Sequence, residues 1–242
     1  MTFSKIYSLS FDFYEDSYEK NLAKFTNLIK QCQANSLILA PELCLTNFSF
    51  ENMQKASEFG KVAISEITKL SHDKTICWTL TTKKNNNFYN TAIMIKDEKI
   101  IYQRDKYKLF KFGDEDKYFH EGNEKDIKIV LVNGIKIAIL ICFEIRFIEL
   151  WQKIRGADVV LVPALWGKLR KQHLEQISEA LAVLNQCYVI VANSKNDNMA
   201  GSSAIITPFG EVVRDDTKEI LSLDFDKKLI KKMRRYMDVG IG

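Results

Sequence analysis

The strongest constraint on the fold comes from short, almost purely apolar runs that stop abruptly at a proline, a cysteine or an asparagine. Such runs occupy residues 36–40, 135–141, 159–162 and 188–192. Runs of this length are typical of strands that are buried on both faces. They are far shorter than the roughly 20 residues that span a bilayer. We therefore expect sheets with both faces covered.

Segments with helical periodicity lie between these runs. Residues 17–33 place Leu22, Phe25 and Leu28 at helical spacing. We expect further helices at 53–71, 147–155 and 173–186, and further strands at 5–9, 75–82, 89–95, 99–102, 204–207, 211–214 and 221–225. Strands alternate with helices at both ends of the chain and follow one another in the middle, which predicts mixed sheets covered by helices. Two stacked sheets with helices outside fit strands that are buried on both faces.

The composition is that of a folded protein. The 242 residues contain neither a linker nor an internal repeat, which favours a single domain over residues 1–242. Apolar residues make up 46% and charged residues 27%, which excludes disordered, collagen-like and disulfide-dense chains. The net charge is only +4, and the one basic cluster, at 227–235, is interpreted as the solvated face of a terminal helix. We expect no nucleic-acid partner.

Cysteine and histidine usage argues against disulfides and metal sites. The five cysteines are odd in number, and none forms a C-x-x-C pair. With only three histidines and no H-E-x-x-H motif, we expect no metal. The N-terminus also lacks the pattern of a signal peptide. We therefore predict a cytoplasmic protein with reduced thiols and no membrane partner.

Three segments carry residue types suited to nucleophilic catalysis. Glu42 comes just after the run 36–40, and a carboxylate past a strand end is well placed to point into a cleft. Lys106 follows the expected strand at 99–102. Cys142 ends the run 135–141, and we expect a helix to begin a few residues later. A helix N-terminus favours a thiolate, and the N–H of the next residue can face an oxyanion.

A thiol nucleophile needs a base to take its proton and a cation to hold the developing negative charge. His173 is the only histidine near these segments, and it lies inside an expected helix. An arrangement in which His173 is the base for the Cys142 thiol is therefore one alternative. A carboxylate with a lysine would do the same work, with Glu42 taking the proton and Lys106 binding the oxyanion.

Together, the three segments resemble the nitrilase, or carbon–nitrogen hydrolase, superfamily over nearly the whole chain. The matching motifs, in the family's order, are P-E-L-C-L-T at 41–46, D-K-Y-K-L-F at 105–110 and C-F-E-I-R-F at 142–147. Supporting matches are Asn90, Gly122, Pro163, Trp166, Asn185, Asn193 and Gly201. The resemblance implies an α/β fold, a four-layer α-β-β-α sandwich of two stacked mixed sheets with outer helices.

The resemblance also implies a chemistry. Glu42, Lys106 and Cys142 would cleave a non-peptide C–N bond of a small amide through a thioester, without a cofactor. Lys106 and the backbone N–H of Phe143 would hold the oxyanion. Many members carry a second glutamate after the lysine, and Glu115 fits best, although Asp114 and Asp116 flank it.

Two departures from the family pattern affect the site and the assembly. Lys108 stands where a histidine is common, so its ammonium must point outward or pair with an acid to avoid repelling Lys106. Leu181 and Leu184 replace a common arginine and glutamate in a helix that often contributes to the family's dimer interface. We expect a homodimer, although this helix lacks the arginine and the glutamate that are common at the family's dimer interface.

The segment after Pro163 indicates the substrate. The spacing of Trp166, Arg170 and His173 resembles the omega-amidase branch, which deamidates 2-oxo-dicarboxylate monoamides. Trp166 would form a pocket wall, and Arg170 or Lys168 would bind the distal carboxylate. The alternatives are an N-carbamoyl amine amidohydrolase, a deaminated glutathione amidase and, outside enzymes, a degenerate member that acts as a binding module. A true nitrilase fits less well.

Overall fold

The computed structural model describes residues 2–15 and 17–241, so residues 1, 16 and 242 of the predicted domain lie outside the described residues. Within these residues, twelve strands form two six-stranded sheets. Sheet A contains, in spatial order, β12 (Ile220–Asp224), β1 (Lys5–Leu9), β2 (Ser36–Leu39), β3 (Lys74–Lys84), β4 (Asn87–Lys96) and β5 (Lys99–Asp105). Sheet B contains β11 (Val212–Arg214), β10 (Ala204–Ile206), β9 (Tyr188–Ala192), β8 (Val159–Pro163), β7 (Ile135–Ile139) and β6 (Val130–Val132).

Both sheets are mixed, and they share one pattern. In sheet A, β1, β2 and β3 are parallel, whereas β12, β4 and β5 pair antiparallel. In sheet B, β7, β8 and β9 are parallel and the remaining strands pair antiparallel. The apolar runs form β2 in the parallel centre of sheet A and all three parallel strands, β7, β8 and β9, of sheet B, which agrees with strands that need cover on both faces.

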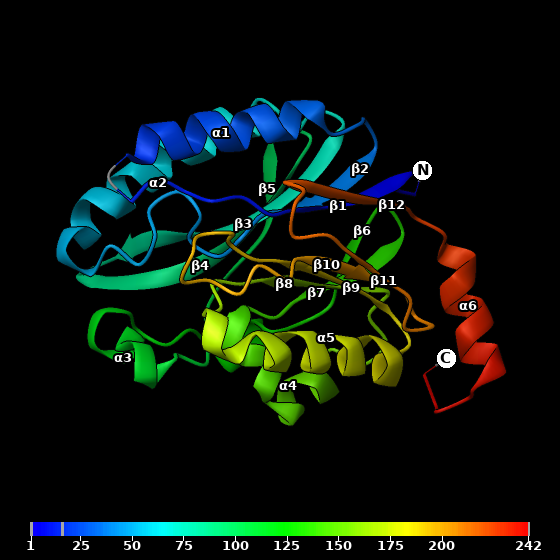
Figure 1. Ribbon diagram of the computed structural model, residues 1–242. Helices are drawn as coiled ribbons and strands as arrows, with labels where there is room; N and C mark the ends of the chain where they lie inside the picture. The colour runs from blue at the N-terminus through cyan, green and yellow to red at the C-terminus, as the bar shows by residue number, and fades with distance from the viewer. Residues whose placement is uncertain (1, 16, 242) are drawn as a thin grey trace.

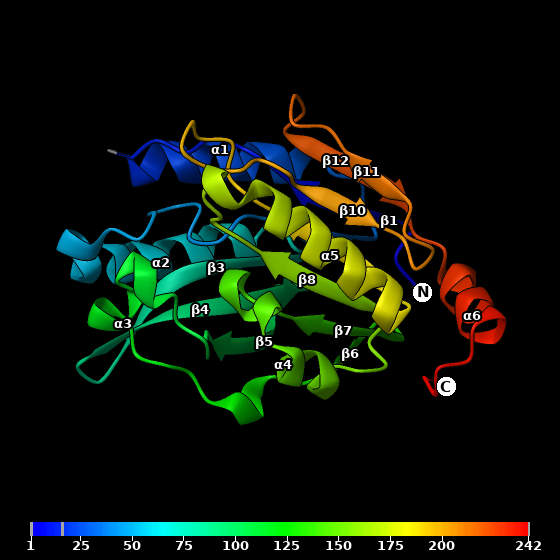
Figure 2. The same ribbon diagram turned by 60° about the horizontal axis from the view of Figure 1, so that its bottom comes forward.

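Helices cover the outer face of each sheet. Figure 1 shows four layers, with α1 (Tyr18–Gln31) and α2 (Met53–Thr68) on one side and α4 (Ile148–Lys153) and α5 (Lys171–Asn185) on the other. The short α3 (Glu115–Tyr118) and the C-terminal α6 (Lys227–Tyr236) lie at opposite ends of the molecule in both views (Figures 1 and 2). The α-β-β-α sandwich that the sequence predicts is therefore confirmed.

Alternating residues of β2 show why its run has no polar face. Leu37 and Leu39 join a core cluster that is shared with sheet B. Ile38 joins a different cluster, which includes Phe25 of α1 and Trp78 of β3. Both faces of the strand are thus removed from water, which is the main source of stability for such a layer.

Local sequence sets the helix boundaries. The Ser17 side chain caps α1 by accepting a hydrogen bond from the Lys20 N–H at 3.3 Å, as its position before an apolar periodic segment suggests. The helix expected at 173–186 instead begins at Lys171 and ends at Asn185. It stops there because Gln186 adopts a left-handed conformation with φ of 51°.

Several short elements were not expected from the sequence. They include β6 and five 3₁₀ turns: η1 (Phe50–Asn52), η2 (Lys111–Gly113), η3 (Glu124–Asp126), η4 (Cys142–Arg146) and η5 (Lys168–Arg170). Single turns leave no periodicity to detect. Three of them, η2, η4 and η5, carry the residues that surround the site described below.

Two further observations bear on assembly and location. On α5, Leu181 is buried in the core whereas Leu184 is 65% exposed; a homodimer stays a prediction. Over residues 2–15 and 17–241, no helix combines the length and the apolarity that crossing a bilayer requires. The cytoplasmic location also stays a prediction.

Candidate active site

The three residues expected to carry chemistry lie at strand ends. Glu42 follows β2, Lys106 directly follows β5, and Cys142 opens η4 after β7. Two antiparallel pairings separate β3 from β5, so β5 points the same way as β2 and β3. The carboxyl ends of these strands therefore open at one edge of the sheet, where ligands of α/β folds commonly bind. This topology brings segments far apart in the sequence into one site.

Lys106 is completely buried and lies between two carboxylates. Its Nζ donates to Glu42 Oε1 at 2.8 Å and to Glu115 Oε1 at 2.7 Å. The side chains of Lys106 and Glu42 are both 0% exposed. A buried ammonium with two carboxylate acceptors has its charge compensated and its position fixed.

Glu42 is held by further donors. The Asn90 side-chain amide donates to Glu42 Oε1 at 2.8 Å, and the backbone N–H of Leu165 donates to Glu42 Oε2 at 3.1 Å. Asn90 lies on β4 and Leu165 follows β8, so both sheets contribute to orienting this carboxylate. Both oxygens accept hydrogen bonds, which fixes the rotamer of Glu42.

The structure distinguishes Glu115 from its two acidic neighbours. Glu115 is 1% exposed, and its Oε2 accepts the backbone N–H of Phe110 at 3.0 Å. Asp114 and Asp116 are exposed, and Asp114 pairs with Lys117 at 2.9 Å on the surface. The acid that meets Lys106 is therefore Glu115.

Burial and charge act in opposite directions on this cluster. Burial alone would lower the pKa of Lys106, but Glu115 and Glu42 outweigh it, and the pKa of Lys106 is raised. Burial raises the pKa of Glu115, an effect that Lys106 opposes and Glu42 reinforces. Lys106 thus stays an ammonium at neutral pH.

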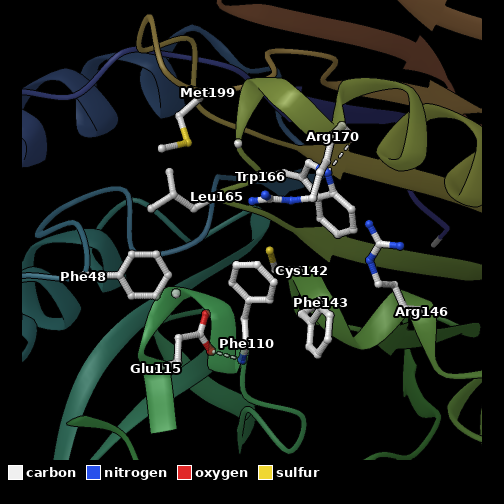
Figure 3. A pocket seen from close by; sticks show the side chains of 12 residues that line it. Phe48, Phe110, Glu115, Cys142, Phe143, Arg146, Leu165, Trp166, Arg170 and Met199 are labelled. Atoms are coloured by element: carbon white, nitrogen blue, oxygen red, sulfur yellow. Dashed lines mark hydrogen bonds between the residues drawn. The ribbon is translucent and has the colours of Figure 1, made fainter. Parts of the chain in front are cut away.

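Cys142 sits on a sharp turn at the bottom of a cavity. Its backbone is left-handed, with φ of 48°, and its side chain is 7% exposed. In Figure 3 its sulfur points into the cavity between Phe110 and Trp166. A left-handed conformation is disfavoured for a residue with a Cβ atom and must be held by its surroundings.

The resting thiol differs from the sequence expectation. Burial, and next to it Glu42, raise the pKa of Cys142 well above its usual range, and Lys106 only partly offsets them. The helix expected a few residues after the thiol is present as α4, which begins at Ile148, but Cys142 itself opens η4, a short 3₁₀ helix that precedes α4. Cys142 is therefore a neutral thiol at neutral pH.

The two other expectations about nearby charge are resolved by geometry. Lys108 points away from Lys106: it pairs with Glu149 at 3.5 Å, and its ammonium lies 4.8 Å from the ring centre of Phe147. His173 is exposed and contacts the guanidinium of Arg146 at 3.0 Å. His173 does not line the cavity, so the Cys/His alternative loses its support.

The cavity above the thiol holds about 200 Å³ and has two unlike sides. Its lining residues are Phe48, Phe110, Gly113, Glu115, Cys142, Phe143, Arg146, Leu165, Trp166, Gly167, Arg170 and Met199. In Figure 3, Phe48, Leu165 and Met199 lie on one side of Cys142, and Arg146 lies on the other. An apolar pocket with a few convergent polar groups is typical of a small-molecule site.

Trp166 and Arg170, the two residues that the sequence predicts around the substrate, both line the cavity. Trp166 is 4% exposed and its indole Nε1 donates to the Arg170 carbonyl at 2.8 Å. The Arg170 guanidinium lies 5.0 Å from the ring centre of Phe110, within the cavity wall. Lys168 is exposed and lines a different hollow, with Asp197 and Asp216. Of the two cations proposed for a carboxylate, only Arg170 faces the site.

Arg146 is the functional candidate that the sequence analysis missed. Its guanidinium lies 4.8 Å from the ring centre of Trp166 and lines the cavity. Burial, and next to it the charge of Arg170, lower the pKa of Arg146. The available signal was its place in the C-F-E-I-R-F motif, four residues after Cys142.

The supporting asparagines play different parts. Asn193 accepts the Trp166 N–H at 2.8 Å and donates to the Gly201 carbonyl at 2.8 Å, so it holds the cavity wall. Asn185 donates to the Leu181 carbonyl within its own helix, and the structure does not bring it into the cavity.

Within the part of the chain that the structure describes, no group of three or more histidine, cysteine or acidic residues is arranged to hold a metal ion.

Comparison with known proteins adds independent findings. Residues 12–235 match the family model described as carbon-nitrogen hydrolase. The chain is 31% identical to a 2-oxoglutaramate amidase of Bacillus subtilis (strain 168), over 96% of this chain and 94% of that protein. It is 24% identical to a deaminated glutathione amidase of Escherichia coli O157:H7, over 92% and 90% of the two chains.

A solved structure supports the fold. The chain superimposes on Saccharomyces cerevisiae Nit3, a member of branch 10 of the nitrilase superfamily, with a TM-score of 0.87. The match covers 98% of this chain and 94% of Nit3 at 21% sequence identity. At this identity the likeness concerns the arrangement of strands and helices.

Proposed function

This chain belongs to the carbon–nitrogen hydrolase family, and we propose that it hydrolyses a small carboxamide to an acid and ammonia with Glu42, Lys106 and Cys142 as its catalytic triad. The observation that carries the proposal is the buried Glu42–Lys106–Glu115 cluster together with Cys142, which lines the cavity. Buried charges are costly, and perturbed ionisable groups in a cleft are typical of catalytic sites.

In the first half-reaction, the sulfur of Cys142 attacks the amide carbonyl carbon while its proton passes to the Glu42 carboxylate. The carbonyl oxygen becomes an oxyanion, held by the Lys106 ammonium and the N–H of Phe143. Glu42 then gives the proton to the departing nitrogen, the C–N bond breaks, and ammonia leaves behind a thioester on Cys142. The raised pKa of the Cys142 thiol fits this step, because the proton moves only when the nucleophile attacks.

In the second half-reaction, a water molecule attacks the thioester carbonyl and gives its proton to Glu42. The oxyanion is again held by Lys106 and Phe143. When the intermediate collapses, the C–S bond breaks and the sulfur regains the proton from Glu42, which restores the starting enzyme. Glu115 takes no proton in this scheme: it orients Lys106 and anchors the chain at Phe110.

For the substrate we infer a 2-oxo-dicarboxylate monoamide such as 2-oxoglutaramate, as an omega-amidase would use. Arg146 and Arg170 supply two guanidinium groups at the cavity wall, suited to a distal carboxylate. The Bacillus subtilis relative is named for this substrate. The alternative is a deaminated glutathione or N-carbamoyl amine amidase, and the apolar side formed by Phe48, Leu165 and Met199 would favour a bulkier amide.

The test is ammonia release from 2-oxoglutaramate, 2-oxosuccinamate, glutamine, an N-carbamoyl amine, deaminated glutathione and an uncharged amide, with Cys142→Ala as the control. We expect release from the two oxo-acid amides that requires Cys142. Release only from the carbamoyl compound or deaminated glutathione would keep the triad and reject the substrate. No release, with Cys142 unreactive toward alkylation, would favour the degenerate binding module.

Arginine variants sharpen the substrate assignment. Arg170→Met should raise KM for 2-oxoglutaramate about 10- to 100-fold, since a hydrogen bond to a charged group contributes roughly 1.5–3 kcal/mol. It should leave KM for the uncharged amide nearly unchanged. Lys168→Met is the matched control, because Lys168 lies nearby but faces another hollow. An equal effect of both variants would reject the carboxylate contact.

A further inference from the structure

A second buried ion pair lies directly behind the triad and has no part in the steps above. Arg104 is the penultimate residue of β5, two positions before Lys106, and Glu144 lies in η4, two positions after Cys142. Both side chains are 0% exposed. Arg104 donates to both carboxylate oxygens of Glu144, at 3.0 Å on Oε1 and by a second bond on Oε2.

Glu144 also binds the backbone on both sides of the site. Its Oε1 accepts the N–H of Tyr107 at 2.7 Å, and its Oε2 accepts the N–H of Ile141 at 2.6 Å. Tyr107 follows Lys106 and Ile141 precedes Cys142 in the chain. One carboxylate therefore connects the segment that presents the ammonium with the segment that presents the thiol.

Arg104 extends this connection across the two sheets. Its Nη2 donates to the carbonyl of Ile139, the last residue of β7 in sheet B, at 2.9 Å. Its Nη1 donates to the carbonyl of Asp105 in sheet A at 3.1 Å. The pair thus hydrogen-bonds the carboxyl ends of β5 and β7, just where each strand delivers its functional residue.

The turn at Cys142 needs such support. Its left-handed backbone is disfavoured and must be held by its neighbours. Glu144 makes two hydrogen bonds with Ile141, the residue before Cys142. The Glu144 carboxylate accepts the Ile141 N–H, and the Glu144 N–H donates to the Ile141 carbonyl at 3.0 Å. These contacts close the turn around the thiol.

We propose that Arg104 and Glu144 form a positioning pair that sets the Cys142 thiol against the Lys106 ammonium across the two sheets. The proposal rests on the proposed function, because it takes these two groups as the reacting ones. Glu144 does the positioning through its two backbone contacts. Arg104 neutralises the Glu144 charge, so that no third carboxylate opposes the developing thiolate beside Glu42 and Glu115.

The test separates positioning from simple stability. Arg104→Met and Glu144→Met each leave one buried charge unpaired and should destabilise the fold. The double variant removes both charges, so it should recover stability, since apolar side chains often replace a buried ion pair well. It cannot recover the contacts to Tyr107 and Ile141. We therefore expect kcat of the folded double variant to be about 100-fold lower than that of the wild type, when both are normalised to the fraction of protein whose Cys142 can be alkylated. KM for the amide should change little.

A matched control is available at the other end of the molecule. Asp158 is 4% exposed, accepts the Lys136 N–H at 3.0 Å and pairs with Arg234 at 3.4 Å. Asp158→Asn should lower stability while kcat stays unchanged. If the double variant does not fold, Glu144→Gln replaces it in the kcat measurement. This variant keeps the side-chain shape and loses one of the two oxygens that accept backbone N–H groups, so its kcat should also fall.

The outcomes are distinct. A double variant with wild-type kcat, or one whose KM rises while kcat is kept, would overturn the positioning role. If the wild-type protein hydrolyses none of the amides, the proposed function fails. Positioning is then tested by the rate of Cys142 alkylation by iodoacetamide, which needs no substrate: an equal rate in wild type and folded double variant would reject it.

Discussion

Charged residues at the two ends of this molecule have opposite surroundings. At the edge where β2, β5 and β7 end, Glu42, Lys106 and Glu115 are buried, and each hydrogen-bonds another member of the cluster. At the far end, α6 carries six basic residues, and Lys231 and Arg235 are exposed. Sequence charge alone does not distinguish these regions, whereas burial does.

The difference shows where charge contributes to structure and chemistry. Removing one partner of a buried ion pair leaves an uncompensated charge and costs about 3–5 kcal/mol. An exposed pair contributes only about 0–1 kcal/mol, because water already solvates each group. The apolar side of α6, Ile230 and Met233, is buried and attaches the helix. The exposed lysines of α6 therefore contribute little to the free energy of unfolding.

The largest expected effect separates two lysines that stand two residues apart. Lys106→Met leaves Glu42 and Glu115 without their shared cation, so we expect a loss of about 3–5 kcal/mol in the free energy of unfolding. The loss of an oxyanion donor should also lower kcat on the order of 10²–10³-fold. Urea unfolding and ammonia release measure the two effects.

Lys108→Met is the matched control for that variant. Lys108 is partly exposed, pairs with Glu149 at 3.5 Å and lies over the ring of Phe147, so its removal should cost about 1 kcal/mol. A kcat for Lys108→Met as low as that of Lys106→Met would contradict the assignment of roles.

A second prediction concerns the thiol and its base. Glu42→Gln removes a carboxylate that raises the pKa of Cys142, so the thiol should become more acidic. The pH profile of Cys142 alkylation should move to lower pH in this variant, while kcat falls about 10²–10⁴-fold through loss of the base. An alkylation profile that stays in place would show that Glu42 does not act on the thiol.

A third, smaller effect is the pH dependence of stability that comes from Glu115. Its pKa is higher in the folded state than its ordinary value, so the folded protein holds this proton more tightly than the unfolded chain does. The contribution to stability is full below the ordinary pKa of about 4.3 and declines as pH rises toward the folded value. Between these values, wild-type unfolding free energy should rise less steeply with pH than that of Glu115→Gln. Parallel curves would contradict the raised pKa.

The smallest effect is expected on α6. Lys231→Glu combined with Arg235→Glu changes exposed charges at the end opposite to α3, so stability should change by about 0.5 kcal/mol or less. The kcat and KM for the amide should match wild type. A large change in kcat or KM would show that the charges on α6 affect the active site at the other end of the molecule.

Much of this fold follows from sequence periodicity, and the exceptions have physical reasons. The run 36–40 predicts a strand because both of its faces are apolar, and residues 17–33 predict α1 because their apolar positions repeat at helical spacing. The strand β6 spans only Val130–Val132, too short to show a period. The short 3₁₀ helix η4 leaves no pattern either, so the sequence predicts no element between β7 and α4, where Cys142 lies.

The site was predicted in part for a related reason. Glu42 and Cys142 each follow an apolar run, and Lys106 follows a strand of mixed polarity, so local sequence places all three residues just after strands. The pairing of Arg104 with Glu144 joins residues 40 positions apart, and only the stacking of two sheets brings them together. Arg146 enters the cavity because η4 turns it there, and its place in the C-F-E-I-R-F motif is the signal for it in the sequence.

The most direct test of the Cys142 mechanism is to quench the wild-type enzyme in acid during turnover of 2-oxoglutaramate and map the covalent adduct by peptide mass spectrometry. The mechanism predicts one acyl group as a thioester on the peptide that contains Cys142, absent in Cys142→Ala and unchanged in Cys187→Ala. Turnover with no adduct at Cys142, or with ammonia still released by Cys142→Ala, would contradict it.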